Sequence, residues 1–257
     1  MEKKRNLHRW EELFPQEFAG IMEKTPIVYF PFGLVEEHGT HLSMCPDFSP
    51  VYRMCLAAAE RTGGVVYPFL PAAPGFNPPL SREEIRQKRL KGECLYKPSL
   101  FLSSECCRLI YDETLESMAG IGFKVCMAVG GHMPAILLMG RLAKEKNGEV
   151  EGMRIENIDW TDIILKSTDI GRRYPEGLAH GGIIETALVM YCDKRLCRLS
   201  QVLQVRDTNF VSQLARLSDE KLEGIRKNAT ISLGREIFEA AVSAIADTAR
   251  SCMEKSG

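Results

Sequence analysis

Three glycine-containing segments hold most of the side chains in this sequence that could do chemistry. The first, FPFGLVEEHGTHLSMCPD, offers Glu36, Glu37, His38, His41 and Asp47 within 12 residues. Glu36 and His38 are two apart, so in an extended segment both point to one side, and Asp47 can meet His38 through the loop. Mixed histidine and carboxylate ligands suit zinc, manganese or iron rather than calcium, and an aspartate that offers both oxygens can bridge two ions. The segment favours a metal site over a hydrogen-bonded turn.

The second segment is KVCMAVGGHMPA, in which a predicted strand ends at Gly130, Gly131 and His132. Paired glycines let the backbone approach a site closely, and Pro134 suits the first turn of the next helix. This segment alone is equally consistent with a metal-binding His132 and with an incidental histidine in a strand-to-helix turn.

The third segment is LAHGGIIETALVMYC, where Glu185 lies five residues after His180 in a run that becomes apolar and helical. A buried carboxylate needs a partner, because an unpaired charge in a low dielectric is costly. A metal ion, an arginine or the histidine could each be that partner. Alternatively, Glu185 lies in the first turn of a helix and stabilises its dipole.

The elements that position these segments alternate along the chain. Short apolar runs at 27–32, 65–70, 123–129 and 152–158 predict strands, and helices are expected over 10–22, 103–119, 134–146, 210–226 and 232–255. Continuous apolar strands separated by helices indicate a parallel sheet covered on both faces. Ligands of such folds bind in the loops that leave the carboxyl ends of the strands, where at least two of the histidines fall.

Composition narrows the class of protein. The chain has 257 residues, 45% of them hydrophobic, and a formal net charge of −1, which excludes general disorder and argues against a nucleic-acid-binding protein. No apolar run is long enough to span a membrane, and no apolar stretch follows the charged start, so we expect no membrane contact and no secretory signal. Nine cysteines without a C-x-x-C pair indicate reduced thiols in a cytoplasmic protein.

We expect a single domain over 1–257 with an elaborated loop at about 71–98. The middle of this loop, SREEIRQKRLKGE, is strongly charged. Such a run is typical of a solvated face. The alternative is a lid or a partner-contact insertion over a site, because long loops in compact domains are often functional.

Together the three segments resemble the creatininase family, also called creatinine amidohydrolases. That family has a Glu-Gln-His-Gly-x-His-Leu segment followed by an Asp, then Asn-Gly-His-Gly-Gly-Asn, then His-Ala-Gly with Glu-Thr-Ser. Here they are EEHGTHL with Asp47, GGHMPA and HGGIIET, in the same order across roughly 27–190. The resemblance implies an α/β fold, a three-layer α/β/α sandwich with a mainly parallel central sheet. It also implies a homo-oligomer, often a hexamer.

The resemblance further implies two divalent metal ions per subunit, zinc foremost with manganese or iron as alternatives, bridged by an aspartate and a water. The implied ligands in this chain are Glu36, His38, Asp47, His132 and Glu185. Glu36 and His132 belong to one ion and His38 to the other. In creatininase, a glutamate two residues after the second-segment histidine completes the ligand set of the second ion. This chain has Pro134 there, so we assign that role to Glu185.

By the same resemblance His180 is the catalytic histidine that handles protons at the scissile bond. Glu37, which replaces the family's usual glutamine and adds negative charge near the site, is assigned with it to the catalytic residues. His41 is expected to orient a ligand. Residues 133–135 replace a polar Gly-Gly-Asn segment that would touch substrate, so creatinine is not the expected substrate.

These residues predict an enzyme in which a metal-activated water cleaves a carbon–nitrogen bond in an amide or cyclic amide of a small polar molecule. One alternative is a ring-opening hydrolase that cleaves a carbon–carbon bond of a keto-cyclitol or sugar, and its products would contain no nitrogen. Another is a non-catalytic binding protein on the same scaffold. No motif for an organic cofactor is present.

Overall fold

Four short apolar segments form a parallel sheet in the computed structural model, which describes residues 5–75, 80–92, 99–147, 152–175, 179–206 and 213–256. The strands are β1 (Ile27–Phe32), β2 (Val65–Val66), β3 (Val125–Gly130) and β4 (Arg154–Ile158), in the order β2-β1-β3-β4. Every pairing is parallel, and β1 pairs with β3 along its whole length. The parallel sheet predicted from the apolar runs is therefore confirmed.

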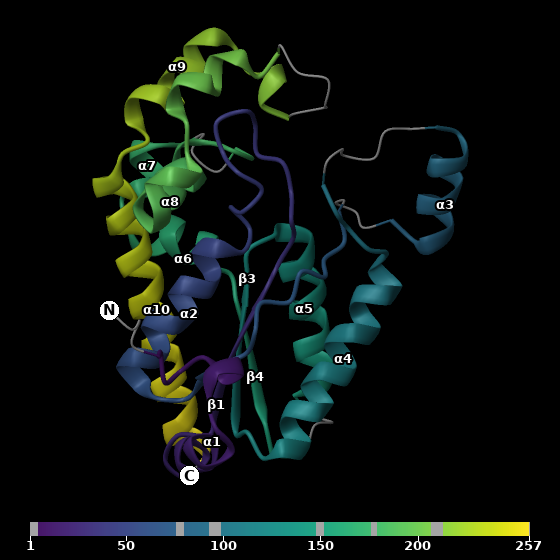
Figure 1. Ribbon diagram of the computed structural model, residues 1–257, viewed down its shortest axis with the longest axis vertical. Helices are drawn as coiled ribbons and strands as arrows, with labels where there is room; N and C mark the ends of the chain where they lie inside the picture. The colour runs from purple at the N-terminus through teal and green to yellow at the C-terminus, as the bar shows by residue number, and fades with distance from the viewer. Residues whose placement is uncertain are drawn as a thin grey trace.

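Helices cover both faces of this sheet (Figure 1). One face packs against α2 (Ser49–Thr62), α6 (Trp160–Ser167), α7 (Ile170–Arg173), α8 (Ile183–Asp193) and α10 (Ile231–Ser256). The other packs against α1 (Pro15–Lys24), α4 (Ser104–Ile121) and α5 (Met133–Lys146). Side chains of β1 alternate between the two cores: Tyr29 faces the first and Phe30 the second. Because both faces are covered, β1 and β3 are buried at every residue.

Several smaller elements lie outside these layers. They are α9 (Asp219–Asn228) and the 3-10 turns η1 (Trp10–Glu12), η2 (Lys194–Leu196), η3 (Leu199–Gln204) and η4 (Gln213–Arg216). The expected helix over 210–226 begins later than predicted, because the Ser218 side chain caps α9 by accepting a hydrogen bond from the amide of Lys221. Residues 210–212 of that prediction lie outside the described residues.

Prolines account for two further differences. The helix expected over 10–22 is wrong in its first half: it divides into η1 and α1, because Pro15 restricts Phe14 to an extended conformation (φ −77°, ψ 154°). The strand expected over 65–70 is reduced to the two residues of β2, with a single bridge from Phe32 to Leu70 beyond it. Pro68 lies between these two parts and has no N–H for a continuous ladder.

The segment at 71–98 contains a helix, α3 (Arg82–Leu90), which projects to one side of the molecule in Figure 1. Ser81 accepts a hydrogen bond from the amide of Glu84, and the Glu84 carboxylate accepts one from the amide of Ser81, which is a capping box. Only Ile85 is buried among the residues of α3. Residues 76–79 and 93–98 of the expected loop lie outside the described residues. Across the described chain, no helix has the length and apolar character that crossing a membrane requires.

Candidate metal centre

The three chemistry-bearing segments meet at the carboxyl end of the sheet. Glu36 and His38 follow β1, and Asp47 lies just before α2. His132 is the N-cap residue just before α5, two residues after the end of β3, and Glu185 lies in the first turn of α8. Parallel strands bring such loops to one edge, which is where ligands of this fold class bind.

Asp47 lies between two groups of possible metal ligands. Its Oδ1 is 3.1 Å from His38 Nε2, and its Oδ2 is 3.2 Å from His132 Nδ1. Glu36 Oε2 is 3.2 Å from the same His132 nitrogen, whereas Glu185 Oε2 is 3.7 Å from His38 Nε2. The ligand atoms of each group, Glu36–Asp47–His132 and His38–Asp47–Glu185, all lie within 4.8 Å of one another. The two carboxylate oxygens of Asp47 thus face different groups.

Burial makes these carboxylates costly without a cation. Glu36 and Asp47 are each 3% exposed. Glu36 Oε2 and Asp47 Oδ2 accept no hydrogen bond from the described residues, and no described lysine or arginine forms an ion pair with either side chain. A buried charge requires compensation. Carboxylate and imidazole donors are the ligands that divalent transition metals take, so the residues present fit a metal centre.

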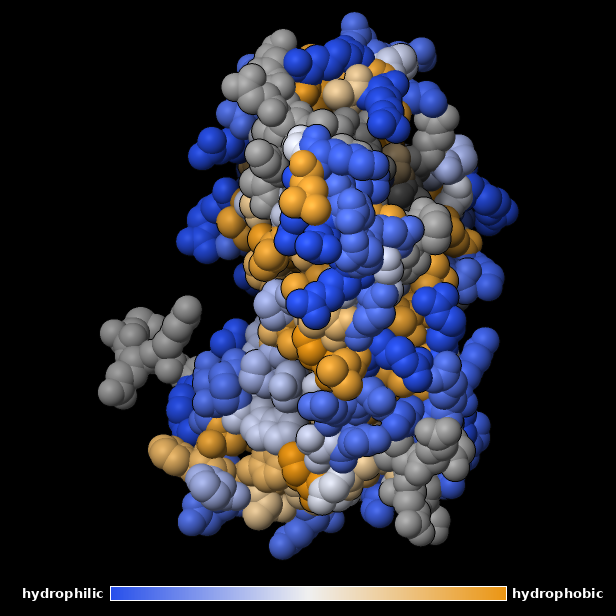
Figure 2. Space-filling model, turned by 90° about the vertical axis from the view of Figure 1, so that its right-hand side faces the viewer, coloured by the Kyte–Doolittle hydropathy of each residue, from blue (hydrophilic) through white to orange (hydrophobic). Residues whose placement is uncertain are grey.

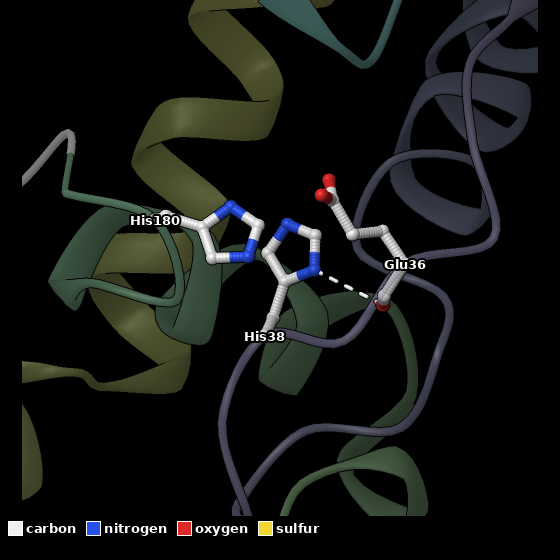
Figure 3. Close-up of side chains that lie close together, drawn as sticks. All are labelled: Glu36, His38 and His180. Atoms are coloured by element: carbon white, nitrogen blue, oxygen red, sulfur yellow. Dashed lines mark hydrogen bonds between the residues drawn. The ribbon is translucent and has the colours of Figure 1, made fainter. Parts of the chain in front are cut away.

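Both histidines present one ring nitrogen to the centre because the other is held by a backbone carbonyl. His38 Nδ1 donates to the carbonyl oxygen of Glu36 at 3.2 Å (Figure 3). His132 Nε2 donates to the carbonyl oxygen of Pro74 at 3.0 Å. Such a bond fixes the ring and its tautomer in metal sites. Sequence reasoning missed Pro74, since a backbone acceptor from a distant loop leaves no pattern of residue types.

The charges of the centre are strongly coupled. Burial alone would lower the pKa of His38 and of His132, but the neighbouring carboxylates outweigh burial and raise each pKa to about 10. Burial opposes ionisation of Asp47, yet the two histidines hold the pKa of that carboxyl well below its usual range. In the absence of metal the centre therefore retains protons that a cation must displace.

Two glycines allow the backbone of Asp47 to reach the ends of the strands. A Cβ on Gly131 would lie 1.8 Å from the carbonyl oxygen of Asp47, and one on Gly33 would lie 2.4 Å from the same atom. No side chain fits at such distances. The close backbone approach predicted from the paired glycines at the end of β3 is present at Gly131. Gly33, just after β1, allows a second close approach to the Asp47 backbone.

His180 lies directly beside His38. The two rings stack with centroids 3.9 Å apart and planes inclined by 26° (Figure 3). His180 Nε2 donates to the carbonyl oxygen of Glu37 at 2.6 Å. The Glu37 carboxylate accepts a hydrogen bond from the amide of Gly39 at 2.9 Å, and the amide of Glu37 donates to Ser99 Oγ at 3.0 Å. The structure thus brings His180 to the metal centre and joins it to the backbone of Glu37.

His41 contacts the third segment rather than a carboxylate of the centre. Its Nε2 donates to Thr186 Oγ1 at 2.9 Å, and that hydroxyl donates to the carbonyl oxygen of Gly181 at 3.1 Å. Burial and the nearby charge of His38 lower the pKa of His41 to about 4, so the ring is neutral. Sequence reasoning missed Thr186, although its place directly after Glu185 was a usable signal. Glu185 itself accepts a hydrogen bond from the amide of Gly181 at 2.6 Å.

Comparison with known proteins agrees with this arrangement of segments. The family described as Creatininase (creatinine amidohydrolase) matches residues 11–249. The chain belongs to the creatininase family. The creatinine amidohydrolase of Pseudomonas putida is 22% identical over an alignment that covers 94% of each protein. The family resemblance of the three segments is thereby confirmed, and with it membership of a family of metal-dependent amidohydrolases.

Solved creatininase structures have the same fold. A mutant creatininase of the Zn–Zn type is 21% identical, with a TM-score of 0.71 over 96% of this chain and 98% of that one. The Mn form of creatininase is also 21% identical, with a TM-score of 0.71 over 95% and 98% of the two chains. The predicted α/β/α sandwich with a parallel central sheet is confirmed by this likeness.

Proposed function

We propose that this protein is a hydrolase that uses two divalent metal ions to cleave a carbon–nitrogen bond in an amide or cyclic amide of a small polar molecule. The observation that carries the proposal is the position of Asp47, whose two buried oxygens face different ligand groups. Glu36 and His132 would hold one ion, His38 and Glu185 the other, and Asp47 both. Zinc is the first choice, with manganese or iron as alternatives.

The ions, when bound, supply Lewis-acid polarisation of the substrate carbonyl and lower the pKa of water toward neutrality. His180 is the group that moves protons. Its Nε2 is engaged by the carbonyl oxygen of Glu37, so its Nδ1 is the nitrogen that exchanges protons with water and with the departing nitrogen of the substrate. The carboxylate of Glu37 adds a negative charge to the same loop and accepts a hydrogen bond from the amide of Gly39.

The start of α5 supports a substrate other than creatinine. Met133 is 41% exposed directly after His132, and Pro134 occupies the first turn of α5. Neither side chain offers a strong hydrogen-bond donor or acceptor, whereas the family segment at this place is polar. We therefore propose a substrate whose recognition depends less on polar contacts from this helix.

Product analysis tests the reaction. The protein as purified is incubated with a panel of lactams, formamides, creatinine and keto-cyclitols, and products are identified by mass spectrometry together with an amine assay. We expect a formamide to release an amine, or a lactam to open to an amino acid with a free amino group, with His180→Asn as the inactive control. A nitrogen-free hydroxy or keto acid from a cyclitol would replace the proposal by carbon–carbon cleavage. Preferred turnover of creatinine would overturn the proposal that the substrate is another molecule. Binding without turnover would favour a non-catalytic binding protein.

Assembly and location are part of the same proposal. We propose a homo-oligomer, with the hexamer as the first expectation, which light scattering of the purified protein tests directly. A cytoplasmic location is supported by the cysteines, since no disulfide joins any of them in the described part of the chain.

A further inference from the structure

A cavity of 670 Å³ lies between helix α3 and the start of α4. Its described lining residues are Arg82, Ile85, Arg86, Arg89, Leu90, Phe101, Leu102, Ser103 and Cys106. None of them belongs to the metal centre. The volume is within the range of about 300–1,000 Å³ that small-molecule sites occupy.

Three arginines give one wall of this cavity a positive charge. Arg82, Arg86 and Arg89 follow the spacing of a single helix face and all line the cavity. Arg86 lies 3.5 Å from Glu83, but both side chains are more than half exposed, so this pair is weak. No aspartate or glutamate is among the described lining residues. Guanidinium groups in this arrangement bind carboxylate, phosphate or sulfonate oxygens in pairs.

Apolar side chains from both α3 and the segment before α4 line the rest of the cavity. Ile85 and Phe101 are buried, and Leu90 and Leu102 extend the apolar surface toward solvent. Figure 2 looks onto this side of the molecule and shows apolar patches set among hydrophilic ones. The segment that contributes Phe101 and Leu102 is held to the rest of the fold by a β-bridge between Leu102 and Pro74. An inorganic anion alone would leave this apolar surface in water.

We infer that this cavity is a binding site for a small organic anion, a molecule with an apolar or aromatic body and one acidic group. The body would lie against Phe101 and Ile85, and the acidic group would contact the arginines of α3. The binding uses charge-assisted hydrogen bonds at one end and burial of apolar surface at the other, so both parts of the ligand contribute.

Calorimetric titration with 2-naphthalenesulfonate tests this site, because a sulfonate is a poor metal ligand and reports little on the metal centre. Sodium sulfate and 2-naphthol serve as the two halves of the probe. We expect the whole probe to bind more tightly than either half. The variant R86Q/R89Q should bind it about tenfold more weakly. The matched variant K88Q/K91Q removes the same charge from the end of α3 and from the residue that follows it. Neither lysine is among the described lining residues, so affinity should change less than about twofold.

The exposed thiol of Cys106 gives a second measurement that needs no variant. Because Cys106 lines the cavity, bound 2-naphthalenesulfonate should slow its alkylation by iodoacetamide, as followed by peptide mass spectrometry. Equal weakening in the two double variants, sulfate or naphthol binding as tightly as the whole probe, or unprotected Cys106 at saturating probe would each overturn the inference. Absence of binding would do the same.

Discussion

The metal centre and helix α3 are both rich in charged side chains, and they hold these charges in opposite ways. In the centre, Glu36, His38 and Asp47 are almost completely removed from water. On α3 only Ile85 is buried, and the arginines of the helix are exposed to solvent. The buried charges of the centre are stabilised by a bound cation and by close backbone contacts. A single substitution there should therefore have a large effect on metal binding and activity. The arginines of α3 stay hydrated and carry little desolvation penalty, so they are available to bind a ligand.

The largest effect is expected from Asp47→Asn, which keeps the size of the side chain and removes its charge. Because Asp47 belongs to both ligand groups, the variant should lose both ions and reduce kcat about 10³-fold or more. Metal analysis and steady-state kinetics measure the two effects. Asp162→Asn, at an exposed position on α6, is the control and should behave as the unaltered protein. An active, metal-loaded Asp47→Asn protein would contradict the shared role of this residue.

Substitutions that alter one ligand group test which residues hold each ion. Glu185→Gln alters only the His38–Asp47–Glu185 group, so the protein should retain one ion per subunit. Glu36→Gln alters the Glu36–Asp47–His132 group and should also leave one ion, held by the His38–Asp47–Glu185 group. Native mass spectrometry counts the ions in each variant. Retention of both ions in Glu185→Gln would show that another residue completes the second group.

Metal binding by the centre should depend strongly on pH. The pKa values of His38 and His132, raised to about 10 in the absence of metal, mean that both rings carry protons at neutral pH. Metal binding must release about two protons, so apparent affinity should rise about 100-fold per pH unit between about pH 7 and pH 9. Calorimetry in buffers of different ionisation enthalpy measures the release. Affinity that does not change with pH would contradict it.

A smaller effect is expected from Gly131→Ala. The new Cβ would lie 1.8 Å from the carbonyl oxygen of Asp47, so the loop or the end of β3 must move, at a cost of about 1–3 kcal/mol in the free energy of unfolding. Gly120→Ala is the matched control, since a Cβ there meets nothing within 4 Å and should stabilise α4 by about 0.5–1 kcal/mol. Urea unfolding of the metal-free proteins compares them. Similar stability in both variants would mean that the Asp47 loop yields freely.

The smallest effect is expected from Ser81→Ala on α3. Loss of the cap should cost about 1 kcal/mol of helix stability and speed proteolysis within α3. The metal content should stay unchanged, because no residue of α3 belongs to a ligand group. A loss of metal in this variant would show that α3 and the centre are linked.

The same two regions show what the sequence could predict. The parallel sheet, the covering helices α4, α5 and α10 and the meeting of the three segments followed from apolar runs and from glycines next to histidines. The covering helices α2 and α6 were not predicted. Helix α3 was described only as part of a loop, although its capping box, Ser81 with Glu84, was visible in the sequence. Pro15 also signals the split of the first helix, but the apolar periodicity continues across 10–22 and favours a single helix.

Contacts between distant backbone segments were beyond sequence reasoning. The carbonyl of Pro74 that orients His132 and the place of Gly33 beside Asp47 depend on loops that meet only in the folded chain. A backbone oxygen is present at every residue, so its role leaves no mark on residue type.

Metal content per subunit tests the central claim most directly. The protein is purified without added metal and without chelator, and its metals are counted by plasma mass spectrometry against protein concentration. The arrangement around Asp47 predicts close to two zinc, manganese or iron ions per subunit. A protein that contains no metal, and takes up none on titration, would contradict the dinuclear centre and the hydrolase proposed on it.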